Sequence, residues 1–226
     1  MGVGRRFIRG EELGESPLWP AAALIASAAL YADLPSRFIA GPGGGAFQVI
    51  RWIVPALTVL VLASVAWIPT HGMITRRRLV LGTIAFVSAA NSASTVLLIH
   101  FLINGAQAHE PSLLLRAAVH MWVVNILLFG LWYWQLDGGG PLARPACPIA
   151  QRDFLFPQQL EPMLAQSGWR PLFLDYLYVS FTNASAFSPT DTMPLSRWAK
   201  MLMLIQSAIS LALAVMVVAR AVNILR

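Results

Sequence analysis

The chain is poor in charged residues. Only 12% of its 226 residues are charged, whereas about 25% is usual for a soluble domain. Hydrophobic residues make up 57% of the chain, so a soluble protein of this composition could not cover its surface with polar groups. The composition therefore favours a protein whose outer surface faces lipid.

Cysteine is nearly absent, and so are the common motifs of catalysis. The single cysteine, Cys147, lies in a proline-rich loop, so an internal disulfide is excluded and no second thiol suggests a metal site. The chain has no glycine-rich phosphate loop, HExxH motif, nucleophile elbow or cluster of Cys and His. We therefore expect no enzymatic activity, no cofactor, and no catalytic or metal-binding residues.

A long basic stripe is also missing, although the net charge is +6. The basic residues fall in short groups between apolar runs, as cations that flank membrane helices do. The densest group is Arg76, Arg77 and Arg78. This pattern argues against a nucleic-acid partner and indicates the lipid bilayer as the main partner.

What the sequence does contain is a series of six apolar runs. They cover residues 18–34, 49–69, 79–103, 113–136, 172–187 and 198–219. A helix of about 20 residues crosses the ~30 Å hydrocarbon core of a bilayer. The predicted fold class is all-α, a polytopic integral membrane helix bundle with five to six transmembrane helices. The fifth helix is expected to be short or re-entrant, because a polar, proline-containing break at residues 188–194 follows it.

We expect one membrane domain over residues 1–226. Residues 1–16 form an N-terminal segment whose mixture of arginine and glutamate is unlike a secretory signal. The other expected parts are a four-helix part (18–136), a long loop (137–170), and a short helix, polar break and long C-terminal helix (171–226).

The distribution of basic residues predicts an orientation. If all six runs cross and the N-terminus is cytoplasmic, the inner segments hold eleven Lys and Arg residues and the outer segments five, of 16 in all. This excess follows the positive-inside rule, and the reversed topology violates it. We therefore expect a cytoplasmic N-terminus.

Polar residues within the apolar runs are the candidate functional residues, because such groups are costly in lipid. Asn91 lies on a polar face of the third run, with Ser88, Ser92 and Thr95 at helical spacing. In the other runs and the break the candidates are Arg116, His120, Asp175, Thr182, Asn183, Ser185, Ser188, Thr190 and Asp191. Two interpretations stay open for these residues: hydrogen bonds between packed helices, or the lining of a polar pathway.

Residues 185–194 resemble the filter region of pore-loop potassium channels. That family shows Thr-Thr-Val-Gly-Tyr-Gly-Asp and a proline three residues later. Ser185, Phe187, Asp191 and Pro194 fall on matching positions. The chain departs from the family at residues 188–190, where Ser-Pro-Thr replaces Gly-Tyr-Gly, so the resemblance does not imply a carbonyl-lined potassium filter.

A closer resemblance covers the last quarter of the chain. Its pattern is Asp175-Tyr-Leu-Tyr-Val-Ser-Phe-Thr182, then Thr190-Asp191, Leu195-Ser-Arg197 and Ala221-Val-Asn223. These residues are similar to a bacterial multi-pass membrane family that is known only as a domain of unknown function. The resemblance implies the bacterial cytoplasmic (inner) membrane and no established activity.

Two functions are therefore predicted. The first is a channel or transporter that uses the segment from Asp175 to Pro194 as its pathway. The second is a structural or accessory subunit of a membrane complex, which forms homo-oligomers or binds other membrane subunits.

Overall fold

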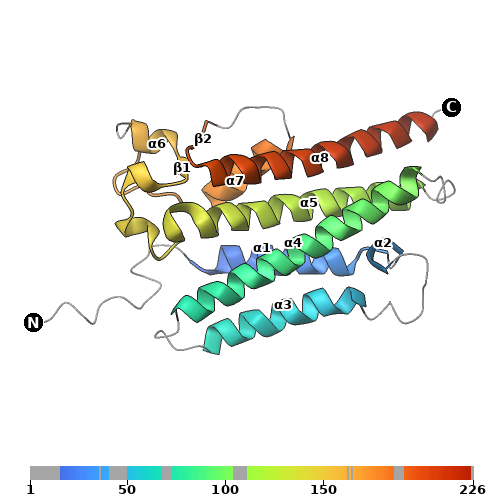
Figure 1. Cartoon of the computed structure of the whole chain (residues 1–226), viewed down its shortest axis with the longest axis horizontal. Coiled ribbons are helices and arrows are strands. Elements are labelled where there is room, and N and C mark those ends of the chain that lie inside the picture. The colour runs from blue at the N-terminus through green and yellow to red at the C-terminus, as the bar shows by residue number, and fades with distance from the viewer. Residues whose placement is uncertain are drawn as a thin grey trace, which may run out of the picture.

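The chain folds into an elongated helix bundle (Figure 1). The computed structural model describes residues 16–35, 37–40, 50–67, 73–103, 111–161, 163, 165–185 and 191–224. Five apolar helices run side by side in the bundle: α1 (Leu18–Ala32), α3 (Ile50–Trp67), α4 (Met73–Ile103), α5 (Pro111–Leu136) and α8 (Arg197–Ile224). The short helix α2 (Arg37–Ala40) follows α1.

Three of these helices are long and apolar enough to cross a membrane. The stretches concerned are Ile74–Phe101, Ser112–Gly139 and Arg197–Val218, with mean hydropathies of 1.6, 1.8 and 2.4. Helices α1 and α3 are apolar but shorter. The predicted helical membrane protein is confirmed at this level, whereas five to six spans do not follow from helix length and composition alone.

Helix α5 is the centre of the bundle. It packs against α1, α4, α7 and α8, and 56% of its apolar stretch is buried, compared with 17% for α8. Large side chains of α5 such as Met121, Leu128 and Tyr133 are fully buried. Helix α8 instead lies at the edge of the bundle and exposes most of its apolar surface.

The start of α4 differs from the sequence prediction. The helix begins at Met73, six residues before the apolar run at Leu79. The three basic residues Arg76, Arg77 and Arg78 therefore lie in the first turns of the helix rather than in the loop before it. Arginine has a high helix propensity, and its long side chain lets a helix extend past the apolar run.

One end of the bundle is covered by the segment from residue 137 to 172, and we call it the loop end. The segment contains 3₁₀ helices at Asp137–Gly139, Arg144–Ala146 and Ile149–Gln151, the strand β1 (Phe154–Leu155) and the short helix α6 (Pro157–Leu160). The strand β2 (Met193–Pro194) pairs antiparallel with β1. The Leu195 N–H also donates to the Asp153 carbonyl over 2.8 Å, so residues 191–195 lie at the loop end.

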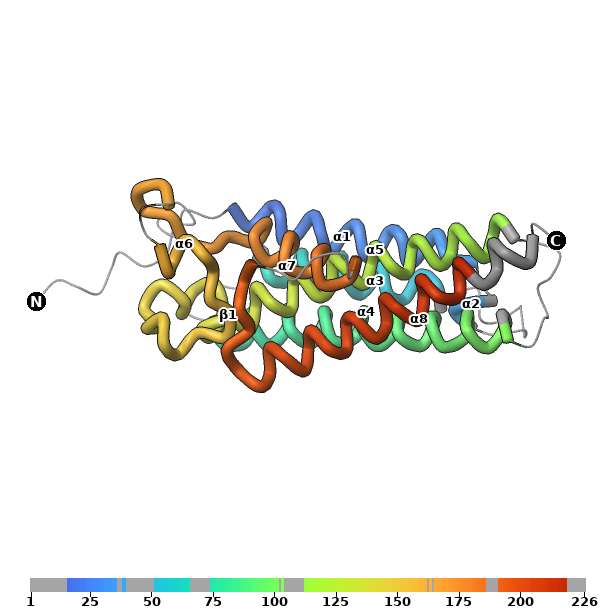
Figure 2. The backbone as a smooth tube through the Cα atoms, turned by 90° about the horizontal axis from the view of Figure 1, so that it is seen from above, coloured from blue at the N-terminus to red at the C-terminus, as the bar shows by residue number. Residues whose placement is uncertain are grey.

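Helix α7 (Phe173–Ser185) enters the bundle from the loop end and stops part-way along it (Figure 2). Its 13 residues span about 20 Å, which is too short to cross the bilayer. The chain is back at the loop end where β2 pairs with β1, so α7 enters and leaves the bundle at the same end. The topology in which all six runs cross is not confirmed, because it places residues 191–194 at the opposite end from the loop.

Candidate functional site

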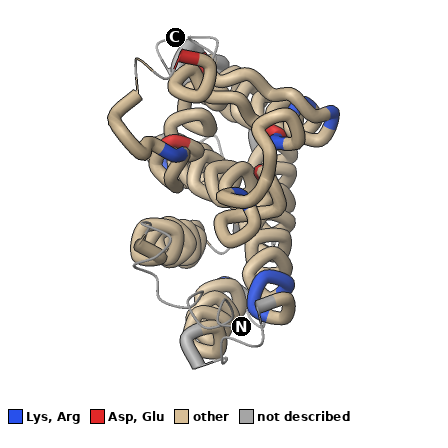
Figure 3. The backbone as a smooth tube through the Cα atoms, turned by 90° about the vertical axis from the view of Figure 1, so that its left-hand side faces the viewer, with Lys and Arg blue, Asp and Glu red and all other residues tan. Residues whose placement is uncertain are grey.

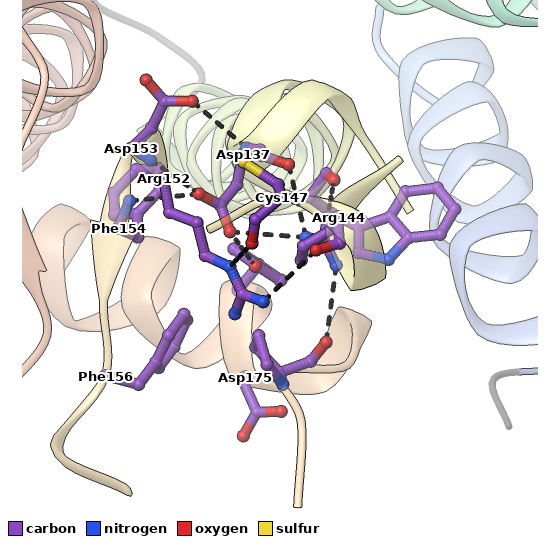
Figure 4. Close-up of polar contacts among 12 residues, drawn as sticks. Asp137, Arg144, Cys147, Arg152, Asp153, Phe154, Phe156 and Asp175 are labelled. Carbon is purple, nitrogen blue, oxygen red and sulfur yellow. Dashed lines mark hydrogen bonds and ion pairs between the residues drawn. The ribbon is translucent and has the colours of Figure 1, made fainter. Parts of the chain in front are cut away.

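A buried ion pair lies within the segment that covers the loop end (Figure 4). The Arg144 Nε lies 3.3 Å from the Asp137 Oδ2, and the side chains are 5% and 0% exposed. The Asp137 Oδ1 accepts the N–H groups of Asp153 and Phe154 over 2.8 and 3.1 Å. The Tyr176 hydroxyl donates to Oδ2, so the carboxylate is held by four partners.

The Arg144 guanidinium joins three parts of the chain. It donates to the Trp134 carbonyl at the end of α5 and to the Pro171 carbonyl before α7, and it lies 4.6 Å over the Tyr176 ring. Guanidinium groups are favourable near the C-terminal carbonyls of a helix. The pair therefore holds the loop, α5 and α7 together.

Three glycines turn the chain back so that Arg144 reaches the end of α5. Gly138, Gly139 and Gly140 have φ values of 56°, 83° and 96°, a region that residues with a Cβ rarely adopt. A Cβ on Gly140 would lie 2.9 Å from the Gln135 carbonyl oxygen. The glycine run after the fourth apolar run is thus what permits the ion pair.

A second polar cluster, the interhelical network, joins α5, α7 and α8. Gln206 of α8 is its centre: its Oε1 accepts the Tyr133 hydroxyl over 2.6 Å and the Asn183 amide over 2.8 Å. The Gln206 Nε2 donates to the Ser180 Oγ over 2.7 Å. Tyr133, Ser180 and Gln206 are all 0% exposed. One side chain of α8 therefore binds the two helices beside it.

The network continues through neighbouring residues of the same three helices. The Ser180 hydroxyl donates to the Ile126 carbonyl over 2.6 Å, and the Ser207 hydroxyl donates to the Asn183 Oδ1 over 3.1 Å. The Asn125 amide donates to the Ser210 Oγ over 2.9 Å. Such hydrogen bonds stabilise helix packing where water is excluded.

The remaining predicted residues of α7 bond locally. The Asp175 Oδ2 accepts the Leu172 N–H over 2.7 Å, so this carboxylate caps the start of the helix. Burial raises the pKa of the Asp175 carboxyl above its ordinary value, and the Leu172 N–H opposes the rise. Thr182 and Ser185 donate to the carbonyls of Tyr178 and Thr182 within the helix.

The polar break is only partly described. Asp191 is exposed at the loop end. Ser188 and Thr190 lie outside the described residues. We call α7 and the polar break together the hairpin. Among the hairpin residues predicted from the sequence, only Asn183 makes an interhelical contact in the part of the chain that the structure describes.

A third cluster lies between α1, α4 and α5, towards the end of the bundle opposite the loop end. The His120 Nδ1 lies 3.5 Å from the Asp33 Oδ2, and the Asn91 amide donates to the Met121 carbonyl over 3.3 Å. Asn91 of α4 thus bonds to the residue that follows His120 on α5. Arg116, one turn before His120, is exposed.

Two polar atoms of this third cluster are buried without a hydrogen-bond partner among the described residues. They are the Asn91 Oδ1 and the Ser94 Oγ, and the two residues are 3% and 1% exposed. The Tyr31 hydroxyl of α1 lies close to Ser94 without completing a hydrogen bond to it. Buried polar atoms of this kind call for an explanation, because nearly all such groups in proteins are paired.

Sequence reasoning missed several residues of these clusters. They are Asp33, Tyr133, Asp137, Arg144, Ser180 and Gln206. Gln206 carried a usable signal, because a primary amide in the middle of the most apolar run is costly unless it is paired. The pair of Asp137 and Arg144 had no such signal in the sequence, because both residues occur in a segment with the composition of an ordinary polar loop.

No group of three His, Cys, Asp or Glu side chains that could hold a metal ion occurs in the described part of the chain. Neither a family model, nor a curated protein, nor a solved structure matches the sequence. The fold and the polar clusters therefore define a class only: an α-helical membrane protein with a short helix that enters and leaves the bundle at the same end.

Proposed function

We propose that the chain is a structural or accessory subunit of a membrane complex, in which α7 is a fixed re-entrant element. The observation that supports this proposal is the interhelical network. The polar side chains with which α7 faces the bundle, Tyr176, Ser180 and Asn183, are each hydrogen-bonded to α5, α8 or the loop segment. A pathway instead needs polar groups that are free to contact a solute.

The proposed topology has five crossings, by α1, α3, α4, α5 and α8. Of the described basic residues, eight belong to segments at or near the loop end, which faces the viewer in Figure 3: Arg76, Arg77, Arg78, Arg144, Arg152, Arg170, Arg197 and Lys200. Four are at or near the opposite end: Arg37, Arg51, Arg116 and Arg220. By the positive-inside rule the loop end, with the N-terminus, is cytoplasmic and the C-terminus is outside. The proposed location is the bacterial inner membrane.

Exposed tryptophans at both ends support a membrane-spanning placement. Trp19 and Trp198, at the loop end, are 59% and 75% exposed, and Trp52, at the opposite end, is 57% exposed. Tryptophan is enriched at the two interfaces of a bilayer. These residues therefore mark the two boundaries between which the five helices cross.

The outward face of α7 is the proposed contact with another membrane subunit or a second copy. Leu174, Tyr178 and Phe181 lie on one side of the helix and are 51%, 58% and 48% exposed. A photo-crosslinking amino acid at Tyr178 tests the contact in native membranes, with the same probe at the buried Ala117 as the control. Adducts of one defined protein mass from position 178 alone support the proposal. Lipid adducts alone from position 178, together with a monomeric protein, would overturn it.

Transport remains a second candidate, because of the third cluster rather than the hairpin. In this cluster the Asn91 and Ser94 oxygens have no hydrogen-bond partner among the described residues, and His120 of α5 lies 3.5 Å from Asp33 at the end of α1. A flux assay in liposomes distinguishes a pathway through the third cluster from a pathway through the hairpin. Transport that His120→Gln abolishes and Asp191→Ala leaves unchanged favours a route through the third cluster. The reverse result favours the hairpin, and no flux above that of empty liposomes favours the structural subunit.

A further inference from the structure

We propose that Asn91 and Ser94, with Tyr31 beside them, form a binding site for a water molecule inside the seam between α1, α4 and α5. The site is distinct from the interhelical network and from the ion pair at the loop end. Its ligand is a small neutral molecule that donates two hydrogen bonds.

The hydrogen-bonding capacity of the two residues defines this ligand. The Asn91 amide nitrogen already donates to the Met121 carbonyl, which leaves its Oδ1 as an acceptor without a donor among the described residues. The Ser94 hydroxyl can both accept and donate. Water donates two hydrogen bonds, accepts two, and is small enough for a space between packed helices.

Ser94 differs from the other buried hydroxyl residues of the neighbouring helices. Ser27, Thr58, Thr83 and Thr95 each donate to the carbonyl four residues earlier in their own helix. That bond is the usual way in which a helical hydroxyl is satisfied in an apolar seam. Ser94 makes no such bond within the described helix, so its oxygen is available to a ligand between the helices.

The proposed route of the water to the surface is at the opposite end. Tyr31 and Met121 each lie within two residues of a member of the Asp33 and His120 pair. The side chain of Asp33 is 58% exposed and that of His120 is 19% exposed. In the proposal, water exchanges through this polar, partly exposed pair.

X-ray radiolytic footprinting of the full-length protein in detergent tests this site, because hydroxyl radicals form from bound water and label adjacent buried side chains. Tyr31 is the reporter, and Tyr133 is its control: the two are 3% and 0% exposed, but Tyr133 lies in the interhelical network, where protein groups satisfy it. We expect labelling of Tyr31 at least several-fold faster than that of Tyr133. Equal slow labelling of the two tyrosines would overturn the proposal.

Two variants link the labelling to the site. Ser94→Ala removes one of the two protein groups that bind the water, with little change in side-chain volume. It should lower Tyr31 labelling several-fold. Thr83→Val changes another buried hydroxyl of α4 that bonds within its helix, and it should leave the labelling unchanged. Unchanged Tyr31 labelling in a folded Ser94→Ala protein would contradict the assignment, and the wild-type comparison with Tyr133 decides the question if that variant does not fold.

Discussion

Asp137 and Arg144 form an ion pair of 3.3 Å whose two side chains are almost completely buried. The pair lies where α5 ends, where the loop begins and where α7 enters the bundle. Both ions are held by further hydrogen bonds, as a buried pair requires if it is to offset the loss of hydration. The pair therefore fixes the point from which the re-entrant helix starts.

Replacing one member of this pair is expected to destabilise the protein strongly. Arg144→Met leaves the Asp137 carboxylate buried without its cation, and breaking a buried pair in this way costs about 3–5 kcal/mol. The free energy of unfolding, measured by denaturant titration in detergent, checks the value. Arg152→Met is the matched control, because Arg152 is only half-buried and bonds to two carbonyls. Equal stability of the two variants would contradict the structural role of Arg144.

Gln206→Leu is expected to weaken the packing of α7 on α8. The substitution keeps the volume but leaves the Tyr133 hydroxyl, the Asn183 amide and the Ser180 hydroxyl without their shared partner. Each buried polar group left unpaired costs about 1–3 kcal/mol. Thermal unfolding followed by circular dichroism measures the loss. Ser207→Ala, which removes a peripheral hydroxyl of the network, should lower the stability much less.

Gly140→Ala is expected to be far more harmful than Gly168→Ala. Both glycines have positive φ, 96° and 76°, but a Cβ at position 140 meets the Gln135 carbonyl oxygen at 2.9 Å, whereas nothing lies within 4 Å of one at position 168. A positive φ at a residue with a Cβ costs on the order of 1–3 kcal/mol. Gly140→Ala should lose this amount and more, because the turn that places Arg144 must shift. Equal melting temperatures of the two variants would argue against the turn.

Asp175 gives a pH-dependent prediction. Burial raises the pKa of its carboxyl in the folded protein, so the folded state holds the proton more tightly than the unfolded state does. The contribution of this group to stability is therefore largest at low pH and falls as the pH rises through the folded-state pKa. The side chain is partly exposed, which keeps the effect small.

Two variants test this assignment. Asp175→Asn keeps an acceptor for the Leu172 N–H and should remove the pH dependence without loss of stability at neutral pH. Asp175→Ala removes the acceptor and should lose about 1 kcal/mol. Unfolding curves recorded from acidic to neutral pH compare the two with wild type. If the asparagine variant keeps the wild-type pH profile, another group causes it.

The helices were predictable because each is a continuous apolar run with its own turn signals. The run at residues 198–219 corresponds to α8, and the short run at 172–187 corresponds to α7. The return of residues 191–195 to the loop end was not predictable. It depends on the pairing of β1 with β2, two strands of two residues each, and such short strands have no periodic pattern in the sequence.

The polar clusters were predictable only in part. Asn91, His120 and Asn183 stand out because they are polar residues in apolar runs. Their partners are residues such as Asp33, Met121 and Gln206, which come from other helices. Which helices meet is decided by packing around α5, so a single sequence does not identify these pairs.

The sidedness of residue 191 tests the re-entrant helix most directly. In a Cys147→Ser background, single cysteines at Ile149, Asp191 and Ser112 are labelled with a membrane-impermeant maleimide in sealed inside-out and right-side-out vesicles. The account predicts that Asp191→Cys and Ile149→Cys react in the same vesicle orientation, and that Ser112→Cys, exposed in the first turn of α5, reacts in the other. Reaction of Asp191→Cys together with Ser112→Cys would show that α7 crosses the membrane, and the account would fail.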